Sequence, residues 1–513
     1  MCYMKIKVYC KEETKKEIGD LVPQLFPAAE YLYVDYENIG LHEGALIIDH
    51  LLVSTLKQKE YSGYSSVFIY YKGQLFDIRD TAGFLEKRRI CTEKEDWMKA
   101  KDINEVLMDI DFLNQNKIHL SYPAFFQIES TDICNSRCIM CDHYFNHNKN
   151  ARILSTETLM HMRDAIQMSR IVNLNGMGEP FVSPAIKEQI DLYVGYGDKI
   201  VANTNLSILD EELISRIEKD FEWLAISVDG ARKETYESIR IGLSYEKLMQ
   251  NLNWLKERAP AVKKIISMVI MRQNVCEMPE MVALAQKVGI DQVVFLNLNP
   301  NLIIGNLQDV MFLYPKVVEY YSVKAIEKGR ECGVTVIVAN AQNLDFNIRW
   351  EDIQEELEKM RSIPLWKTQK EEEQMEEISA IIDHYKEEHD LYQDTTIPSK
   401  VRCSGVCDWI LKNCYTNLYG DISMCCRNLI YRAGRVEKEG DFLSVWNAPL
   451  MQKTREIFYS GYLPESCLKC GMIEGGELEF LKVDLSPEFY QDSEIKKGQK
   501  IVLKELLGGH HGL

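Results

Sequence analysis

The sequence has no apolar run long enough to cross a lipid bilayer. Its longest apolar stretches, such as Ile265–Met271, fall far short of the roughly 20 residues that a spanning helix needs. The first residues also lack the pattern of basic residues followed by an apolar stretch that marks an export signal. We therefore expect a cytoplasmic protein that has no membrane partner.

An excess of positive charge is also missing. The 513 residues include 60 Lys and Arg against 78 Asp and Glu, which gives a formal net charge of −18. Such a chain has little positive field to attract phosphates, so nucleic acid is not an expected partner. The hydrophobic fraction of 46% and the charged fraction of 27% are those of ordinary folded proteins, and the length predicts two or three domains.

Cysteine, by contrast, is plentiful, with 15 residues. A cytoplasmic compartment keeps thiols reduced and a chain of this length does not depend on disulfides, so a secreted disulfide framework is excluded. Cys2, Cys10 and Cys91 are isolated and are expected to act as small hydrophobic residues. Most of the others gather in two segments, which indicates metal binding.

Residues 1–120 predict a small α/β domain. Its expected elements are strands at Lys5–Cys10, near Tyr31–Tyr36 and at Val67–Tyr71, with helices from Glu12 and through Leu41–Leu56. No catalytic spacing occurs in this segment. Recognition of a substrate or partner is a role open to it.

Residues 121–340 alternate short apolar runs with amphipathic helical patterns, which is typical of βα units around a parallel sheet. The expected strands are Phe125–Ile128, Ile171–Asn175, Ile200–Asn203, Trp223–Val228, Ile265–Ile270 and Val293–Leu296. Six such units fit a wound sheet or a partial barrel. In both architectures ligands gather at the carboxyl ends of the strands.

The remaining chain divides by composition. Residues 341–400 are dense in Glu and Lys and predict a charged helical linker. Residues 401–483 are rich in cysteine and form a separate module, and residues 484–513 are a tail without a recognisable site.

Three cysteines follow the first strand of the core in a single loop. Cys134, Cys138 and Cys141 are separated by three and then two residues. A [4Fe–4S] cluster usually takes four thiolates, so three would leave one iron open to a chelating ligand. A zinc site completed by His143 is the alternative, and the spacing differs from that of bacterial ferredoxins.

This cysteine motif resembles the CxxxCxxC signature of the radical S-adenosylmethionine (SAM) superfamily, which lies after the first strand of a partial (βα)6 barrel. Met140 departs from it, since many members place an aromatic residue there. The resemblance implies an α/β fold with a radical SAM core, between an N-terminal α/β domain and a C-terminal cluster module. It also implies that the cluster reduces SAM to methionine and a 5′-deoxyadenosyl radical, which abstracts hydrogen from a substrate.

Residues after the next strands resemble the SAM-binding motifs of that family. Gly176–Pro180 is similar to the motif that holds the methionine amino group, which implies roles for Gly178 and Glu179. The polar contacts to SAM then fall on Asn205 and Ser227, and Arg240 matches an arginine that pairs with the SAM carboxylate. Asp229 follows Ser227 by two residues. We expect it either to contact a ligand or to cap the helix that follows.

The C-terminal module resembles SPASM-type domains. Cys407, Gly420 and Cys425 match the opening of that motif, and Trp409 and Trp446 resemble its aromatic residues. Since cysteines are absent after Cys470, the module is similar to the shorter twitch type. The implied ligands of one auxiliary [4Fe–4S] cluster are Cys407, Cys425, Cys467 and Cys470. Nearby Cys403, Cys414 and Cys426 leave this assignment open, and a zinc ribbon is the alternative.

The sequence thus favours a radical SAM enzyme that oxidatively modifies a peptide or protein, supplied with electrons by a reductant such as flavodoxin or ferredoxin. A dehydrogenase or epimerase of a small molecule, such as a carbohydrate or aminocyclitol, is the second hypothesis. A non-catalytic iron–sulfur or zinc protein is the third, and it leaves the SAM-binding resemblances without explanation.

Overall fold

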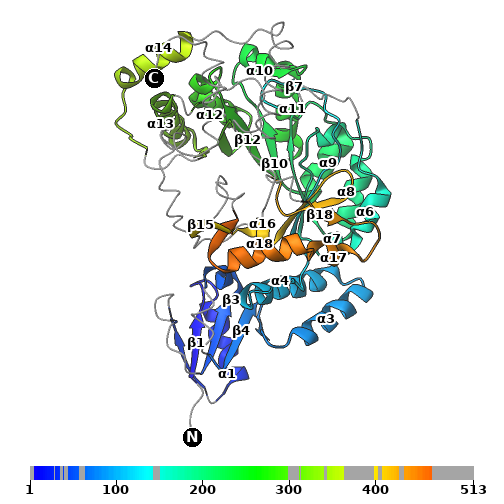
Figure 1. Cartoon of the computed structure of the whole chain (residues 1–513). Coiled ribbons are helices and arrows are strands. Elements are labelled where there is room, and N and C mark those ends of the chain that lie inside the picture. Colours follow the sequence, from blue (N-terminus) through cyan, green and yellow to red (C-terminus); the bar gives the residue numbers. More distant parts are fainter. Residues whose placement is uncertain are drawn as a thin grey trace.

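A computed structural model gives the fold (Figure 1). The residues that the structure describes are 5–27, 29–34, 39, 44–56, 64–141, 151–298, 311, 314–339, 344–362, 398–402, 407–426 and 432–464. The expected tail at residues 484–513 and most of the expected linker lie outside them. The described part of that linker includes helix α14 (Trp350–Ser362).

The N-terminal segment contains a five-stranded sheet in the order β2-β1-β3-β4-β5. Its strands are β1 (Lys5–Tyr9), β2 (Glu30–Tyr33), β3 (Ala45–Asp49), β4 (Ser66–Tyr71) and β5 (Gln74–Asp77). The pairings are parallel except for that of β4 with β5. Helices α1 (Lys15–Leu25), α3 (Thr81–Glu93) and α4 (Trp97–Leu113) belong to the same segment.

The helix predicted through Leu41–Leu56 is wrong. Ala45–Asp49 is the central strand β3, and a short 3-10 helix, His50–Thr55, follows it. Every residue of β3 is buried, because the sheet is covered on both faces. A strand of this kind shows a continuous apolar run in place of alternation, so its periodicity does not distinguish it from a buried helix.

The six strands predicted for the core are confirmed, and they form a parallel α/β partial barrel. The core strands are β6 (Phe125–Ile128), β8 (Ile171–Asn173), β9 (Lys199–Thr204), β10 (Phe221–Ser227), β12 (Lys263–Ile270) and β13 (Gln292–Asn297). A further parallel strand, β14 (Thr335–Val338), pairs with β13. The connecting helices are α6 (Thr156–His161), α7 (Arg163–Met168), α8 (Ile186–Gly195), α9 (Glu211–Asp220), α10 (Lys233–Ile239), α11 (Tyr245–Arg258), α12 (Met278–Lys287) and α13 (Pro315–Cys332).

The C-terminal segment continues the core sheet. Strand β16 (Asn413–Thr416) pairs in parallel with β6, and β17 (Asp421–Ser423) and β18 (Arg432–Arg435) follow it in antiparallel order. Gly420 occupies the turn between β16 and β17 with φ of 77°, a left-handed conformation that favours glycine. The segment also contains the pair β15 (Pro398–Arg402) and β19 (Tyr462–Pro464) and the helices α16 (Asp408–Leu411), α17 (Phe442–Trp446) and α18 (Pro449–Tyr459).

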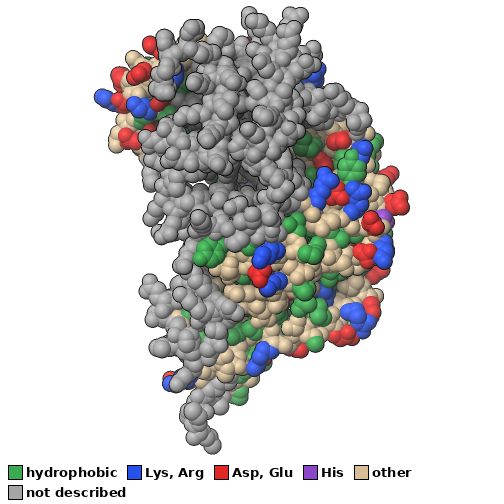
Figure 2. Space-filling model, in the orientation of Figure 1, with side chains coloured by type: hydrophobic (Ala, Val, Ile, Leu, Met, Phe, Trp, Pro, Cys, Tyr) green, Lys and Arg blue, Asp and Glu red, His purple; other side chains and the backbone are tan. Residues whose placement is uncertain are grey.

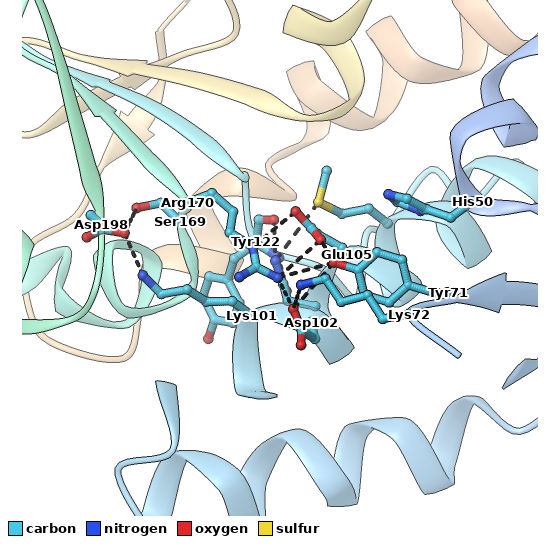
Figure 3. A network of polar contacts seen from close by, with 12 residues as sticks. His50, Tyr71, Lys72, Lys101, Asp102, Glu105, Tyr122, Ser169, Arg170 and Asp198 are labelled. Atoms are coloured by element: carbon cyan, nitrogen blue, oxygen red, sulfur yellow. Dashed lines mark hydrogen bonds and ion pairs between the residues drawn. The ribbon is translucent and has the colours of Figure 1, made fainter. Parts of the chain in front are cut away.

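The N-terminal segment packs against the amino ends of the core strands. On α4, Lys101 forms an ion pair of 2.6 Å with Asp198, which directly precedes β9. Figure 3 shows a second set of contacts beside it, in which Asp102 and Glu105 of α4 bind Arg170, directly before β8. Figure 1 shows α18 lying between the N-terminal sheet and the barrel. The junction therefore lies at the opposite strand ends from the cysteine loop.

The described residues contain no helix that is long and apolar enough to span a membrane. On the described part of the face in Figure 2, acidic and basic side chains lie interspersed.

Candidate functional site

The three cysteines of the first motif lie at the carboxyl end of β6. After β6 the chain enters the loop, and the short strand β7 (Arg137–Cys138) pairs antiparallel with β11 (Arg240–Ile241), placing Arg240 opposite Cys138. The backbone N–H of Cys141 donates to the carbonyl of Cys138 at 3.0 Å, which forms a tight turn. Backbone pairing and this turn thus hold two of the three thiols in defined positions.

A serine hydroxyl lies between two of the thiols. Ser136 Oγ is 3.3 Å from Cys134 Sγ and 3.4 Å from Cys138 Sγ. Cys138 is buried and Cys134 and Cys141 are half-buried. Burial raises the pKa of the Cys138 thiol, and the positive charge of Arg240 opposes this rise.

Three thiols in one short loop are a donor set that suits an iron–sulfur cluster with one open iron. Among the described residues, no three His, Cys, Asp or Glu side chains are already arranged to hold a single metal ion. His143, the fourth zinc ligand that we considered, lies outside the described part. The chemistry of three thiols in one loop fits a [4Fe–4S] cluster.

The Gly176–Pro180 segment packs directly on the cysteine loop. The N–H of Gly178 donates to Thr131 O at 3.2 Å, and the N–H of Glu179 donates to Ile133 O at 2.8 Å. A Cβ atom at position 178 would lie 2.4 Å from Ile133 O, a distance that the backbone would have to open to accommodate. Gly178 is therefore needed for this close approach.

The carboxylate of Glu179 accepts three hydrogen bonds from the chain itself. Its donors are Thr204 Oγ1 and Asn205 N, each at 2.6 Å, and Phe181 N at 3.3 Å. Burial raises the pKa of Glu179, and these donors oppose the rise. Glu179 thus joins the segment after β8 to the end of β9.

Asn205 connects the end of β9 to the cysteine loop. Its Nδ2 donates to Asn135 Oδ1 at 2.9 Å, and Asn135 Nδ2 donates to Ser207 Oγ at 2.7 Å. Ser207 donates back to Asn205 Oδ1 through its N–H at 2.9 Å. Asn135, between the first two cysteines, was not among the residues singled out in the sequence, because only the fold reveals its partners.

Ser227 and Asp229 lie at the carboxyl end of β10. Ser227 ends β10 and is half-buried, opposite Ser267 of β12. Asp229 is buried; its Oδ1 accepts from Val269 N at 2.7 Å, and its Oδ2 forms an ion pair of 2.6 Å with Arg240 Nη2. The helix-cap role considered for Asp229 is wrong, because α10 begins after Arg232 and has no side-chain cap.

A buried glutamate that the sequence did not single out links the site to the C-terminal segment. Glu129 follows β6, and its Oε1 accepts from Met177 N at 2.6 Å. Its Oε2 accepts from the hydroxyl of Tyr415 on β16 at 3.4 Å. Burial raises the pKa of Glu129. The only sequence signal was its position at the end of a core strand.

The cysteines of the second motif are described in part. Cys407 and Cys425 are buried, whereas Cys403, Cys467 and Cys470 lie outside the described residues. Cys414 lies within β16, opposite Phe126, and is completely buried in the core, so its position is that of a packing residue. Cys426 is half-buried.

The two tryptophans of that motif both contribute to packing. Trp409 contacts Phe125 of β6 edge-on, with ring centroids 6.0 Å apart. Trp446 is fully buried beside Phe442, and the guanidinium of Arg455 lies 4.7 Å from its ring. Trp409 thus packs the C-terminal segment against the core strand β6.

The part of the chain that contains the cysteine loop is similar to known proteins. Residues 128–285 match the model of the radical SAM superfamily. A mycofactocin maturase, MftC, of Mycolicibacterium smegmatis is 28% identical over 172 residues, which cover 33% of this chain and 43% of MftC. The match therefore spans less than half of that relative's length.

A second curated protein and a solved structure are also similar to this chain. A tungsten-containing aldehyde ferredoxin oxidoreductase cofactor-modifying protein of Pyrococcus furiosus is 22% identical over 184 residues, covering 34% of this chain and 52% of that protein. Among solved structures, SuiB of Streptococcus suis bound to precursor peptide SuiA matches with a TM-score of 0.46 and 15% identity, over 75% of this chain and 81% of that one. Residues 128–285 of this chain are a radical SAM domain, of the family that uses a [4Fe–4S] cluster and SAM.

Proposed function

We propose that this protein cleaves SAM reductively and uses the reaction to remove hydrogen from a peptide or protein substrate. The observation that carries the proposal is the position of Cys134, Cys138 and Cys141 at the carboxyl end of β6, within the matched domain. The segments after β8 and β9 are hydrogen-bonded to this loop. Ligands of such folds bind at this end of the sheet.

The proposed roles of the cysteine loop follow from its contacts. The three thiolates would hold the cluster, and the cluster with bound SAM would supply a hydrogen-abstracting radical. The Asn135–Asn205 hydrogen bond fixes the loop against the end of β9. The ion pair of Asp229 with Arg240 fixes it on the side of β10. Contacts of this kind hold the loop against the ends of two neighbouring strands, which is how a fold orients catalytic groups.

SAM would bind beside the cluster at the residues predicted from the motifs. The backbone of Gly178 and Glu179, together with Asn205 and Ser227, is the proposed set of polar contacts. The Nε of Arg240 is buried and has no hydrogen-bond acceptor among the described residues, which leaves it available to a carboxylate. The carboxylate of Glu179 is already satisfied by three donors, so its proposed role is to support this wall of the site.

The C-terminal module would hold an auxiliary [4Fe–4S] cluster through Cys407, Cys425, Cys467 and Cys470. Support comes from the attachment of this module to the core, since β16 extends the sheet beside β6 and Tyr415 contacts Glu129. A cluster in a module joined to the barrel in this way would accept an electron from a substrate radical, which suits a net oxidation of the substrate. A low-potential donor such as flavodoxin or ferredoxin would supply electrons, in the cytoplasm.

If four cysteines of the C-terminal module hold their own cluster, it should survive loss of the first site. Protein with Cys134, Cys138 and Cys141 all replaced by alanine is expected to retain about one [4Fe–4S] cluster, because four thiolates complete a coordination shell without the barrel. Analysis of iron, sulfide and zinc in the purified triple variant measures how much cluster it retains. Adding Cys407→Ala and Cys425→Ala should remove the remaining iron. One equivalent of zinc and no iron in the triple variant would instead identify a structural zinc site.

A peptide substrate is favoured over a small molecule by the relatives that are named maturases. The described N-terminal segment packs at the amino ends of the strands, so a peptide held there would have to extend to the opposite end to be modified. The alternative, dehydrogenation or epimerisation of a carbohydrate or aminocyclitol, has no separate support in the structure.

The test begins with a search beside the gene for an open reading frame that encodes a short peptide, followed by anaerobic incubation of the reduced protein with SAM and that peptide. The expected product is the peptide lighter by two hydrogen atoms. One hydrogen atom would leave to form 5′-deoxyadenosine. The other would leave as a proton and an electron, the electron being accepted by the cluster that the C-terminal cysteines would hold. Unchanged peptide, with a small sugar or cyclitol oxidised in its place, would establish the alternative.

A further inference from the structure

Arg240 makes two close contacts beside the cysteine loop. Its Nη1 lies 3.7 Å from Cys138 Sγ, within hydrogen-bond distance of a sulfur acceptor. Its Nη2 forms the 2.6 Å ion pair with Asp229. The side chain of Arg240 is 10% exposed and that of Asp229 is fully buried. Solvent therefore does little to screen the charges that face this thiol.

The surrounding fold holds this arrangement from several sides. The antiparallel pairing of β7 with β11 places Arg240 opposite Cys138, and Ile139 N donates to Ile239 O at 3.0 Å. Asp229 is itself fixed, because its Oδ1 accepts from Val269 N at 2.7 Å. A third contact comes from Asn274 Nδ2, which donates to Asp229 O at 2.9 Å. The guanidinium thus has little freedom to turn away from the sulfur.

We propose that the Asp229–Arg240 pair positions Cys138 and sets the reduction potential of the cluster that this cysteine would bind. The inference rests on the proposed function and adds a role distinct from contact with SAM. A hydrogen bond and a positive charge at a thiolate sulfur favour the reduced, more negative cluster. The buried carboxylate partly cancels that positive charge.

The two residues therefore have effects of opposite sign. Arg240→Gln removes the positive charge and should shift the midpoint potential to a more negative value. Asp229→Asn keeps an oxygen for Val269 N but leaves the charge of Arg240 uncompensated, so it should shift the potential to a more positive value. Arg240→Lys, which retains the charge, should lie between the wild type and Arg240→Gln.

The experiment measures the potential of the first cluster in anaerobically reconstituted full-length protein without SAM, by electron paramagnetic resonance at poised potentials. All variants carry Cys407→Ala and Cys425→Ala, so that signals from the C-terminal module do not interfere. Arg232→Gln is the matched control, because Arg232 pairs with Glu280 at the surface. The control should retain the potential of the parent protein.

Shifts of opposite sign in Arg240→Gln and Asp229→Asn support the proposal. Unchanged potentials, or shifts of the same sign, overturn it, since general damage to the loop has no reason to depend on the sign of the removed charge. An unchanged potential with weaker SAM binding in Arg240→Gln assigns the arginine to SAM alone and also overturns it. Failure of the proposed function is distinct: the parent protein would then form a cluster of measurable potential without cleaving SAM.

Discussion

Replacing Cys138 by alanine should abolish the formation of 5′-deoxyadenosine from SAM and lower the iron content by about four atoms per chain. Two thiolates would remain for a cluster that already has one iron without a protein ligand. Cys138 is also the most enclosed of the three, since it pairs with Arg240 through the backbone and contacts Ser136. Iron analysis and chromatography of the reaction products measure the two effects.

Cys91→Ala is the matched control for this experiment. Cys91 is a half-buried cysteine on α3 in the N-terminal segment and should be dispensable for cluster binding. Its variant is expected to keep the iron content and SAM cleavage of the wild type. Undiminished cleavage in Cys138→Ala would show that the loop does not hold the cluster.

The second large effect concerns the junction at the amino ends of the barrel strands. Lys101 and Asp198 have no exposed side-chain surface and are joined at 2.6 Å (Figure 3). Lys101→Met should lower the free energy of unfolding by ~3–5 kcal/mol, because it leaves a buried carboxylate without its partner charge. Ser169 Oγ, which donates to Asp198 at 3.1 Å, replaces only part of that interaction. Urea unfolding measures the change.

Two further variants make this prediction specific. Lys99→Met, on the same helix, removes an exposed ion pair with Asp96 and should change stability far less than Lys101→Met, because solvent screens this pair. The double change of Lys101→Met with Asp198→Asn should recover part of the lost stability, because no buried charge remains unpaired. Equal destabilisation by Lys99→Met and Lys101→Met would contradict a special role for the buried pair.

The sequence predicted the core well because each βα unit carries its own signal. An apolar run such as Phe125–Ile128 followed by an amphipathic helix has one satisfactory arrangement, a strand in a parallel sheet covered by that helix. A helix was predicted in place of β3, because β3 is buried on both faces and lacks the alternating pattern of a half-exposed strand. The addition of β16 to the edge at β6 joins residues nearly three hundred positions apart, and no local pattern encodes such a pairing.

The candidate site could likewise be predicted only in part from the sequence. The spacing of Cys134, Cys138 and Cys141 within one loop carries the chemistry, so it was visible in the sequence. The residues that hold that loop in place could not be predicted. Asn135 and Glu129 form hydrogen bonds with residues that are distant in the sequence, and only the fold shows these partners. The pairing of Arg240 with Asp229 likewise depends on the folded approach of β11 to β10.

If this protein cleaves SAM reductively, 5′-deoxyadenosine is the product that shows it. Anaerobically reconstituted wild-type protein is reduced with dithionite in the presence of SAM, beside the variant in which Cys134, Cys138 and Cys141 are all alanine. We expect 5′-deoxyadenosine and methionine in equal amounts from the wild type and none from the variant. Wild-type protein that carries its full iron and sulfide but yields no 5′-deoxyadenosine would contradict it.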